Sequence, residues 1–392
     1  MRRRLIRIAL ILLLFPPLLA AVGGWLVAPG FLTPIRRELT PDLIREADTS
    51  FAVTRSQRQE FDVRAPDGVL LRGWSVTPPQ PNGSWVLLFH GVADNRVGVI
   101  GQSEFLLRAG YSVIMMDARA HGASAGPIAT DGWLERNDTR AIIDTLFASH
   151  VGPCFGGPAV DLPGPPRCGP FHIFALGESM GGGIALQSAG ADPRIEAVVA
   201  ESSFANLREA SYDYAGLRQY PWLGKTLLSP FTWTLLYRGE KLSGLPVAEV
   251  SPVKAVASRA FPVLLICDEK DVELPCRHSE MIYAAARGPK QLWRVPGAFH
   301  SAAHGFQPEE FKRRVLSFFA TYATLPLPPR LLAPRPLRPP RYLRPRLPSP
   351  KRLTFLRLRQ LSVLRRVRGG RSGPWQKLKV KSPGRVGFSI ES

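Results

Sequence analysis

The segment Gly177-Glu178-Ser179-Met180-Gly181 places a serine between two glycines, directly after the apolar run Phe171–Leu176 and before a helical pattern. A serine hydroxyl is a weak nucleophile at neutral pH. It attacks an acyl carbon only where a tight strand-to-helix turn exposes it beside a base and backbone donors. Glycines permit such a turn because they lack a side chain. The segment therefore predicts Ser179 as a nucleophile.

A nucleophilic serine needs a histidine to take its proton, and on a strand-turn-helix unit of this kind the chain order is serine, acid, histidine. His300 lies on a loop just after the last predicted strand, where such a base is expected. His304 is the alternative, but it falls toward the following helix. His278 stands at a helix start, and we interpret it as an ordinary polar residue.

The acid that orients the histidine is expected in the loop after the apolar run Pro262–Cys267. That loop offers four carboxylates: Asp268, Glu269, Asp271 and Glu273. We favour Asp271, because it lies at the loop apex before the next helix starts. Asp268 is the second candidate, and the remaining acids are interpreted as solvated loop charges.

The negative oxygen that forms during acyl transfer needs two backbone N–H donors. Met180, which follows the nucleophile, is expected to supply one. Val92, in the turn after the strand Trp85–Phe89, is our choice for the other. His90 is expected to hold that turn by hydrogen bonding, while Arg119 and His121 are interpreted as structural.

The elements that must position these residues follow from short apolar runs separated by segments of helical length. This alternation predicts an α/β fold with a mostly parallel, twisted sheet covered by helices on both faces. A hairpin is expected around Pro66-Asp67-Gly68. An aromatic-rich insertion at about 203–250 predicts a cap, and the Pro/Gly-rich stretch from Gly152 to Pro170 predicts a surface loop. The runs expected to form strands are Trp85–Phe89, Tyr111–Met116, Phe171–Leu176, Ile195–Ala200, Pro262–Cys267 and Gln291–Val295.

The chain from about Phe61 to Tyr322 resembles the α/β-hydrolase superfamily, and most closely the branch of serine aminopeptidase-like and monoacylglycerol-lipase-like hydrolases. The matching pieces are His90-Gly91, Asp117-x-Arg119-x-His121-Gly122, the Ser179 segment, Asp271 with Pro275, and Gly297-x-x-His300. Where relatives commonly have His-Gly after the seventh strand, this chain has Cys267-Asp268, which adds a second carboxylate. The resemblance implies a Ser-acid-His triad, and it covers neither the N-terminal segment nor the tail.

Together these features predict a membrane-anchored serine hydrolase that cleaves a carboxylic ester through an acyl-enzyme. The expected partner is a small-molecule acyl substrate, with no cofactor and no metal, because no Cys/His cluster has metal-ligand spacing. An aminopeptidase or other amidase, a thioesterase and an acyltransferase use the same triad and stay open. A non-catalytic binding module is less favoured, since such proteins usually lack the serine or histidine.

Charged residues are distributed unevenly along the 392 residues of the chain. The formal net charge is +20, yet residues 30–324 are close to neutral and the basic residues gather at both ends. We therefore divide the chain into an N-terminal segment 1–30, a connecting stretch 31–60 broken by prolines, a catalytic domain 61–324 containing the cap, and a tail 325–392. The composition excludes a disordered chain and a disulfide-dense miniature scaffold.

The N-terminal segment carries four arginines before an uncharged run from Ile8 to Ala28. Its 21 residues suffice to cross a bilayer as a helix. We favour an uncleaved anchor with the catalytic domain on the extracytosolic side, because the arginines orient it by the positive-inside rule and no Ala-x-Ala cleavage site is present. Secretion after signal cleavage is the alternative.

The tail from Leu325 holds 18 Lys and Arg residues, one acidic residue and ten prolines between 326 and 350. This composition predicts polyproline-like or disordered chain. Contact with anionic lipid and a charged extension without a role are the two main interpretations, whereas nucleic-acid binding is disfavoured.

Four cysteines form two close pairs along the chain, Cys154 with Cys168 and Cys267 with Cys276. An exported domain meets an oxidising compartment, so both pairs are expected to be disulfides. The second pair would fix the loop that holds Asp271.

Overall fold

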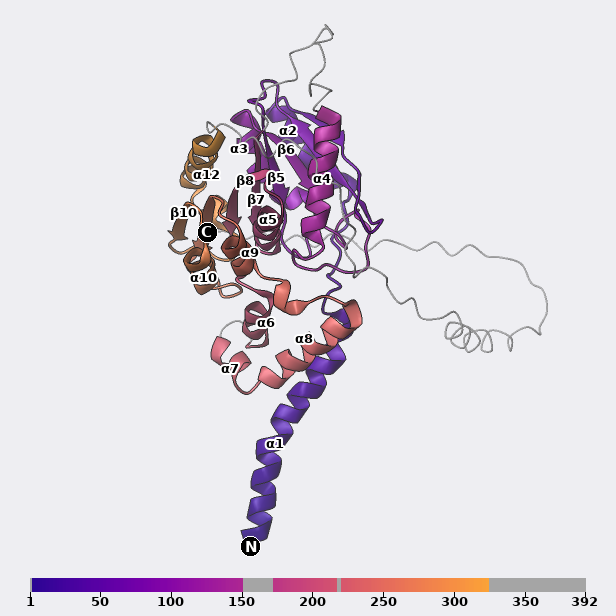
Figure 1. The fold of residues 1–392 in the computed structure, drawn as a ribbon, viewed down its shortest axis with the longest axis vertical. Helices are drawn as coiled ribbons and strands as arrows, with labels where there is room; N and C mark the ends of the chain where they lie inside the picture. Colours follow the sequence, from indigo (N-terminus) through magenta and orange to yellow (C-terminus); the bar gives the residue numbers. More distant parts are fainter. Residues whose placement is uncertain (1, 151–171, 217–219, 324–392) are drawn as a thin grey trace, which may run out of the picture. The chain divides into compact units, whose positions relative to one another are not determined.

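The computed structural model describes residues 2–150, 172–216 and 220–323, all within one compact unit. Its centre is an eight-stranded sheet (Figure 1). In spatial order the strands are β1 (Gln57–Glu60), β4 (Gly73–Thr77), β6 (Ser112–Met116), β5 (Ser84–Phe89), β7 (His172–Glu178), β8 (Ile195–Glu201), β9 (Val263–Asp268) and β10 (Lys290–Val295). β4 runs antiparallel to β1 and β6, and the other neighbouring strands pair in parallel. The predicted fold class is confirmed.

Helices cover both faces of this sheet because successive strand residues point to opposite sides. In β5, Trp85 and Leu87 join one core and Val86 and Leu88 the other. The first core also receives α4 (Glu135–His150), α5 (Met180–Ala191), α9 (Pro252–Ser258) and α10 (Arg277–Ala285). The second receives α2 (Pro41–Val53), α3 (Ile100–Arg108) and α12 (Pro308–Ala323).

Residues 31–60 are more than the predicted connecting stretch. They contain α2 and the edge strand β1, so the sheet begins before Phe61. Pro41 does not break a helix but starts one: Thr40 caps it, accepting from the Leu43 N–H. Proline suits the first helical position because its missing N–H would have no intrahelical partner there.

The predicted hairpin around Pro66-Asp67-Gly68 is present as β2 (Val63–Arg64) paired with β3 (Leu70–Leu71). It forms a separate two-stranded sheet, and the residues that follow it enter the main sheet as β4. Shorter helices complete the fold: η2 (Arg96–Val99) after β5 and α11 (Ala303–Phe306) after β10. The loop expected between Gly152 and Pro170 lies outside the described residues.

A cap stands between β8 and α9, as the aromatic-rich insertion predicted. It comprises α6 (Leu207–Ala215), α7 (Pro221–Lys225), α8 (Ser229–Ser243) and η3 (Val247–Glu249). Its own apolar cluster joins Leu207 and Leu236 to Leu32, from the segment after the first helix, and to Leu274, from the loop after β9. The cap therefore packs against both the N-terminal segment and the loop that carries Asp271.

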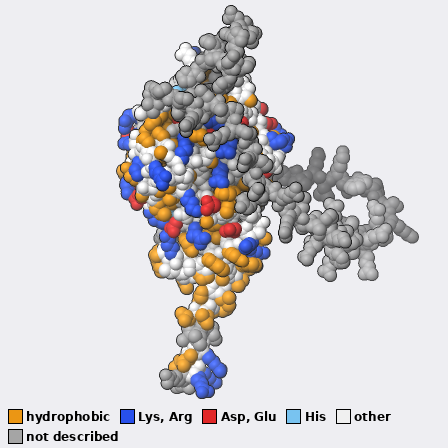
Figure 2. Space-filling model, in the orientation of Figure 1, with side chains coloured by type: hydrophobic (Ala, Val, Ile, Leu, Met, Phe, Trp, Pro, Cys, Tyr) orange, Lys and Arg blue, Asp and Glu red, His pale blue; other side chains and the backbone are white. Residues whose placement is uncertain are grey.

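The first helix, α1 (Arg2–Val27), is followed by η1 (Ala28–Gly30) and packs along α8. Its window Leu13–Gly30 has a mean hydropathy of 1.6 and is mostly exposed, so α1 is long and apolar enough to cross a membrane. Figure 2 shows hydrophobic side chains along α1 and over the adjoining cap, with basic side chains at the far end of the helix. The tail 325–392 lies outside the described residues.

Candidate active site

Ser179 occupies a sharp turn between β7 and α5. Its φ of 53° is in the left-handed region, which costs a non-glycine residue energy and recurs at functional sites. The neighbouring glycines make the turn possible. A Cβ at Gly177 would collide with the Gly181 carbonyl, and one at Gly181 would collide with the Phe89 carbonyl. The glycine spacing seen in the sequence is thus a requirement of close packing between the turn and the neighbouring strand.

The structure brings His300 and Asp271 to Ser179 in one hydrogen-bonded line. Ser179 Oγ lies 2.9 Å from His300 Nε2, and His300 Nδ1 lies 2.7 Å from Asp271 Oδ2. Because a carboxylate accepts at Nδ1, the proton belongs on that nitrogen, and Nε2 is free to accept from the serine. Burial lowers the His300 pKa, but the hydrogen bond and charge of Asp271 outweigh it and raise the pKa above its usual value.

Asp271 is itself held firmly. Its side chain is fully buried, and Oδ1 accepts hydrogen bonds from the backbone N–H groups of Glu273 and Leu274 at 2.8 and 2.9 Å. The Lys270 N–H donates to the Ala298 carbonyl, which ties this loop to the one carrying His300. Both oxygens of the carboxylate are therefore occupied, and one of them faces the imidazole.

The alternative histidines lie elsewhere. His304 packs against Phe105 and Phe311, with ring centroids 5.5 and 5.1 Å away, and burial lowers its pKa. His278 is fully buried and bridges the Asp213 carboxylate and the Ala205 N–H. It is therefore a structural residue that joins α10 to the cap.

Asp268, the alternative acid, belongs to a second buried group beneath the His300 loop. Its Oδ2 accepts from Ser202 Oγ at 2.9 Å and from the Ala302 N–H at 3.2 Å. Glu201 contacts Asp268 directly and accepts from the Ala303 N–H at 2.8 Å. Burial is the main cause that raises the pKa of both carboxyl groups. Repulsion from Asp268 adds to it for Glu201, and repulsion from Asp271 adds to it for Asp268. The two carboxyls clamp the backbone just after His300.

Sequence reasoning missed Glu201. The available signal was its place directly after the apolar run Ile195–Ala200, where a parallel strand ends at the same edge as Asp268. Glu178 was likewise passed over as the variable residue before the nucleophile. It accepts from Gln102 Nε2 at 3.1 Å, and burial raises its pKa to about 7.

The residues expected to bind the oxyanion flank Ser179. Met180 is the first residue of α5, so its N–H has no intrahelical acceptor. Val92 follows Gly91, which lies close to the nucleophile: a Cβ built on Gly91 would be 3.7 Å from Ser179 Cβ. The Val92 N–H has no backbone acceptor among the described residues. Two N–H groups are therefore available next to the nucleophile.

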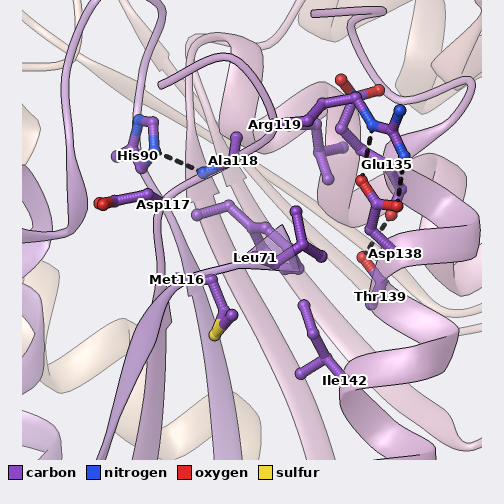
Figure 3. A pocket seen from close by; sticks show the side chains of 12 residues that line it. Leu71, His90, Met116, Asp117, Ala118, Arg119, Glu135, Asp138, Thr139 and Ile142 are labelled. Carbon is purple, nitrogen blue, oxygen red and sulfur yellow. Dashed lines mark hydrogen bonds and ion pairs between the residues drawn. The ribbon is translucent and has the colours of Figure 1, made fainter. Parts of the chain in front are cut away.

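His90 holds this turn, as expected. Its Nε2 accepts from the Ala118 N–H at 3.0 Å, so Nδ1 carries the proton and donates to the Gly91 carbonyl at 2.7 Å. Behind the turn is a cavity of about 20 Å³, room for about one water molecule (Figure 3). Along it, Arg119 is paired with Asp138, consistent with a structural role. An acyl chain does not fit this cavity.

A disulfide joins Cys267, the next-to-last residue of β9, to Cys276, just before α10, with the Cα atoms 5.2 Å apart. This predicted pair closes the loop that carries Asp271. Cys154 and Cys168 lie outside the described residues. Within the described ranges, no cluster of three or more His, Cys, Asp or Glu side chains is arranged to hold a metal ion.

Comparison with known proteins agrees with this architecture. Residues 46–233 match the family model of X-Pro dipeptidyl-peptidases (S15 family), a segment that contains Ser179 and ends before Asp271. The α/β-hydrolase domain-containing protein WAV2 of Arabidopsis thaliana is 25% identical over 275 residues, covering 68% of this chain and 79% of that protein. The chain belongs to the α/β-hydrolase superfamily. The predicted branch within it stays a prediction.

Three further matches are informative. The uncharacterized protein YqkD of Bacillus subtilis is 26% identical over 308 residues, covering 76% of this chain and 93% of that protein. The esterase Pf2001 of Pyrococcus furiosus superposes with a TM-score of 0.55 at 22% identity, covering 74% of this chain and all of that one. An acylaminoacyl peptidase of Pyrococcus horikoshii has a TM-score of 0.50 at 16% identity, covering 68% and 42%. At 22 and 16% identity, these two structural similarities show a shared fold only.

Proposed function

We propose that this protein is a membrane-anchored serine hydrolase that cleaves carboxylic esters. The observation that carries the proposal is the hydrogen-bonded line from Ser179 through His300 to Asp271, at 2.9 and 2.7 Å. The Ser179 hydroxyl attacks the ester carbonyl carbon while His300 Nε2 takes its proton. The N–H groups of Met180 and Val92 stabilise the oxyanion.

The two half-reactions balance through His300. Protonated His300 gives its proton to the leaving-group oxygen as the bond from that oxygen to the acyl carbon breaks. The alcohol departs, and the acyl group stays bonded to Ser179 Oγ as an ester. A water molecule then attacks the acyl carbon, giving its proton to His300, and the carboxylic acid departs as that proton returns to Ser179 Oγ. Asp271 keeps Nδ1 protonated throughout and stabilises the imidazolium.

An apolar acyl group is supported by the exposed residues beside the triad. The side chain of Val92, the proposed oxyanion donor, is 50% exposed, and Val272 and Phe299, which adjoin Asp271 and His300 in the chain, are 51 and 61% exposed. Large apolar side chains at such positions suit an alkyl or aryl group rather than a charged peptide terminus. The structural neighbour Pf2001 is an esterase, which agrees with this substrate class.

A peptidase or amidase is the second candidate, favoured by the match to the X-Pro dipeptidyl-peptidase family model. The same triad hydrolyses amides if His300 protonates the leaving amine. Esters of graded acyl length, set against X-Pro and acylaminoacyl amides, separate the two. A higher kcat/KM on the amides would overturn the ester proposal.

Labelling with a fluorophosphonate tests the nucleophile. Ser179→Ala is expected to abolish labelling and esterase activity, while Ser188→Ala, a buried serine of α5 that donates to Thr139, retains both. Labelling that persists in Ser179→Ala would overturn the assignment. Circular dichroism of both variants checks that the fold is kept.

The anchor rests on α1, with four arginines before its uncharged run placing the catalytic domain outside the cytosol. The Cys267–Cys276 disulfide suits that oxidising side. The protein is expected to remain in the membrane fraction through high-salt and carbonate washes, because burial of an apolar helix does not respond to ionic strength. A soluble mature protein beginning near Ala21 or Val22 would show signal cleavage instead.

A further inference from the structure

The cap helix α8 is fitted against the last turns of α1. Thr234 Oγ1 donates to the Ala21 carbonyl at 2.8 Å, and Arg238 donates to the Trp25 carbonyl and lies over the Trp25 ring, 4.6 Å from its centroid. Gly24 allows the close approach, since a Cβ there would collide with the Phe231 carbonyl. The cap and α1 are therefore one packed unit.

This contact fixes where α8 lies if α1 crosses a bilayer. The hydrocarbon core needs about 20 residues of helix, and the uncharged run Ile8–Ala28 offers 21. The contacts at Ala21 and Trp25 fall within the last eight residues of that run, about 12 Å of helix. A helix packed there cannot stay in bulk water; it must lie at the depth of the lipid interface.

The side chains of α8 match that depth. One stripe, Thr232, Leu235 and Leu236, is buried in the cap, and a second, Phe231, Thr234 and Arg238, faces α1. The third stripe contains Trp233 and Tyr237, which are 57 and 47% exposed and stacked with centroids 5.4 Å apart. A water-facing stripe is normally polar, so these two stacked rings form an exposed apolar patch.

Further exposed apolar side chains lie in and beside α7, which precedes α8 along the chain. We use the name interfacial face of the cap for Tyr220, Trp222, Leu227, Trp233 and Tyr237, all at least 47% exposed. No charged residue occurs from Thr226 to Tyr237, and the following charges are Arg238, Glu240 and Lys241, two basic and one acidic. Tryptophan and tyrosine flanked by basic residues are typical of membrane interfaces, where rings meet the headgroup region and cations meet anionic headgroups. Figure 2 shows hydrophobic side chains over this part of the molecule, continuous with those of α1.

The other side of the cap reaches the proposed machinery. Asp213 of α6 binds His278 and Arg277 at the start of α10, directly after the loop that carries Asp271. Leu274 of that loop lies in the cap's apolar cluster. The position of the cap is thus linked to the position of the acid.

We propose that α7 and α8 dock into the lipid interface of the bilayer that α1 crosses, so that the enzyme takes acyl esters from the lipid phase. The proposal rests on the anchoring proposed above and extends the substrate class to esters that partition into membranes. We choose the bilayer over a second copy of the chain as the partner of this face, because the contact between α8 and α1 already places α8 at the depth of the lipid interface.

Quenching by brominated lipids tests the docking in the full-length protein. The protein is reconstituted into phosphatidylcholine/phosphatidylglycerol vesicles whose acyl chains carry bromine, and the quenched fraction of tryptophan emission is measured. Trp25, Trp222 and Trp233 are the tryptophans proposed at interface depth. Trp222→Phe/Trp233→Phe is expected to lower the quenched fraction to about half. Trp293→Phe, at a core residue 7% exposed, is the control and does not lower it.

Each outcome decides a separate point. A quenched fraction that falls in Trp25→Phe but not in Trp222→Phe/Trp233→Phe overturns the docking and keeps the anchor. A fall only in the double variant supports docking and overturns anchoring by α1. No fall in either overturns both. A cross-linked dimer that Trp222→Ser/Trp233→Ser abolishes, without bromine quenching, overturns docking in favour of a second copy.

A kinetic measurement tests the lipid-phase substrate independently of fluorescence. The rate on a long-chain ester in vesicles is divided by the rate on a water-soluble short-chain ester. Trp222→Ser/Trp233→Ser is expected to lower this ratio at least about tenfold, or about 1.4 kcal/mol. Val53→Ser, at a side chain 59% exposed on α2, leaves the ratio unchanged. An unchanged ratio in the cap variant overturns delivery from the lipid phase, while failure of fluorophosphonate labelling bears only on the nucleophile.

Discussion

The carboxyl edge of the sheet and the outer face of the cap are built in opposite ways. At the sheet edge, Asp271 is buried and both its oxygens accept hydrogen bonds, so neighbouring protein atoms determine its position. On the cap, Trp222 and Trp233 are more than half exposed. In the first region the folded chain supplies every partner that Asp271 needs, whereas the second leaves large apolar side chains more than half exposed.

This difference separates two sources of constraint. Residues that perform chemistry need partners at fixed distances, and a folded chain supplies them from its own backbone. Residues that meet a lipid phase need only the right depth and an apolar surface. Substitutions at the sheet edge are therefore expected to cost orders of magnitude in rate, and conservative substitutions on the cap are expected to cost little.

The largest effect is expected at His300. His300→Ala should lower kcat by about 10³-fold or more, because no other imidazole among the described side chains hydrogen-bonds Ser179, while His304→Ala should cost far less. Adding Ser179→Ala to His300→Ala should worsen the loss little, since triad members act as one unit. Steady-state kinetics on a soluble ester measure all three. A greater loss at His304 would break the assignment.

The two carboxylates sharpen the comparison within the sheet edge. Asp271→Asn should cost up to about 10³-fold in kcat, no more than His300→Ala, because the amide no longer holds His300 in the required tautomer. Asp268→Asn should cost less than about tenfold, because the amide oxygen still accepts from Ser202 and the Ala302 N–H. The same ester assay compares them. A larger loss at Asp268 would transfer the acid role to it.

The disulfide should show an intermediate effect. Cys267→Ser/Cys276→Ser frees the loop that carries Asp271, and a displacement of about 1 Å there lowers the rate by up to about 10²-fold. Its effect on global stability is about 2–3 kcal/mol in the entropic model, because the closed loop is short. Steady-state kinetics of wild type and variant measure the effect on the rate, and urea unfolding measures the effect on global stability. Equal rates would mean that hydrogen bonds alone position the loop.

The smallest effect is expected in the pH profile. Only neutral His300 accepts the Ser179 proton, so kcat/KM rises with pH as His300 loses its own proton. Since Asp271 raises the His300 pKa, the acid limb of the wild type should have its midpoint above pH 6.5. Removing that charge in Asp271→Asn should move the midpoint to lower pH while activity falls. A shift to higher pH would contradict the assigned pair.

The sequence predicted the sheet and the candidate triad because both have short-range signals. Gly177 and Gly181 are needed by contacts within the turn and with β5, and apolar runs mark buried strands wherever they pair. Glu201 escaped prediction because its partner Asp268 is 67 positions away and only strand pairing brings the two together. Pro41 was predicted to break a helix, but proline also occurs at the first position of helices. The capping residue Thr40 directly before it is the signal that distinguishes a helix start from a helix break.

The exposure of the cap aromatics was equally beyond prediction. Trp233 and Leu236 lie one turn apart on the same helix, yet one is exposed and the other is buried. Composition predicts an aromatic cap but not which of its faces the rest of the protein covers. That depends on how α8 packs between the cap interior and α1, a tertiary arrangement with no local sequence signal.

The fit between α1 and α8 bears on how a soluble form of this protein can be prepared. Removing residues 1–27 takes away the Trp25 ring on which Arg238 lies and exposes the part of α8 near Phe231 against which Gly24 packs. The newly exposed surface of α8 would favour aggregation during purification. A truncation just before Ala20 removes most of the apolar run and keeps these contacts, so it is the better starting point for crystallisation.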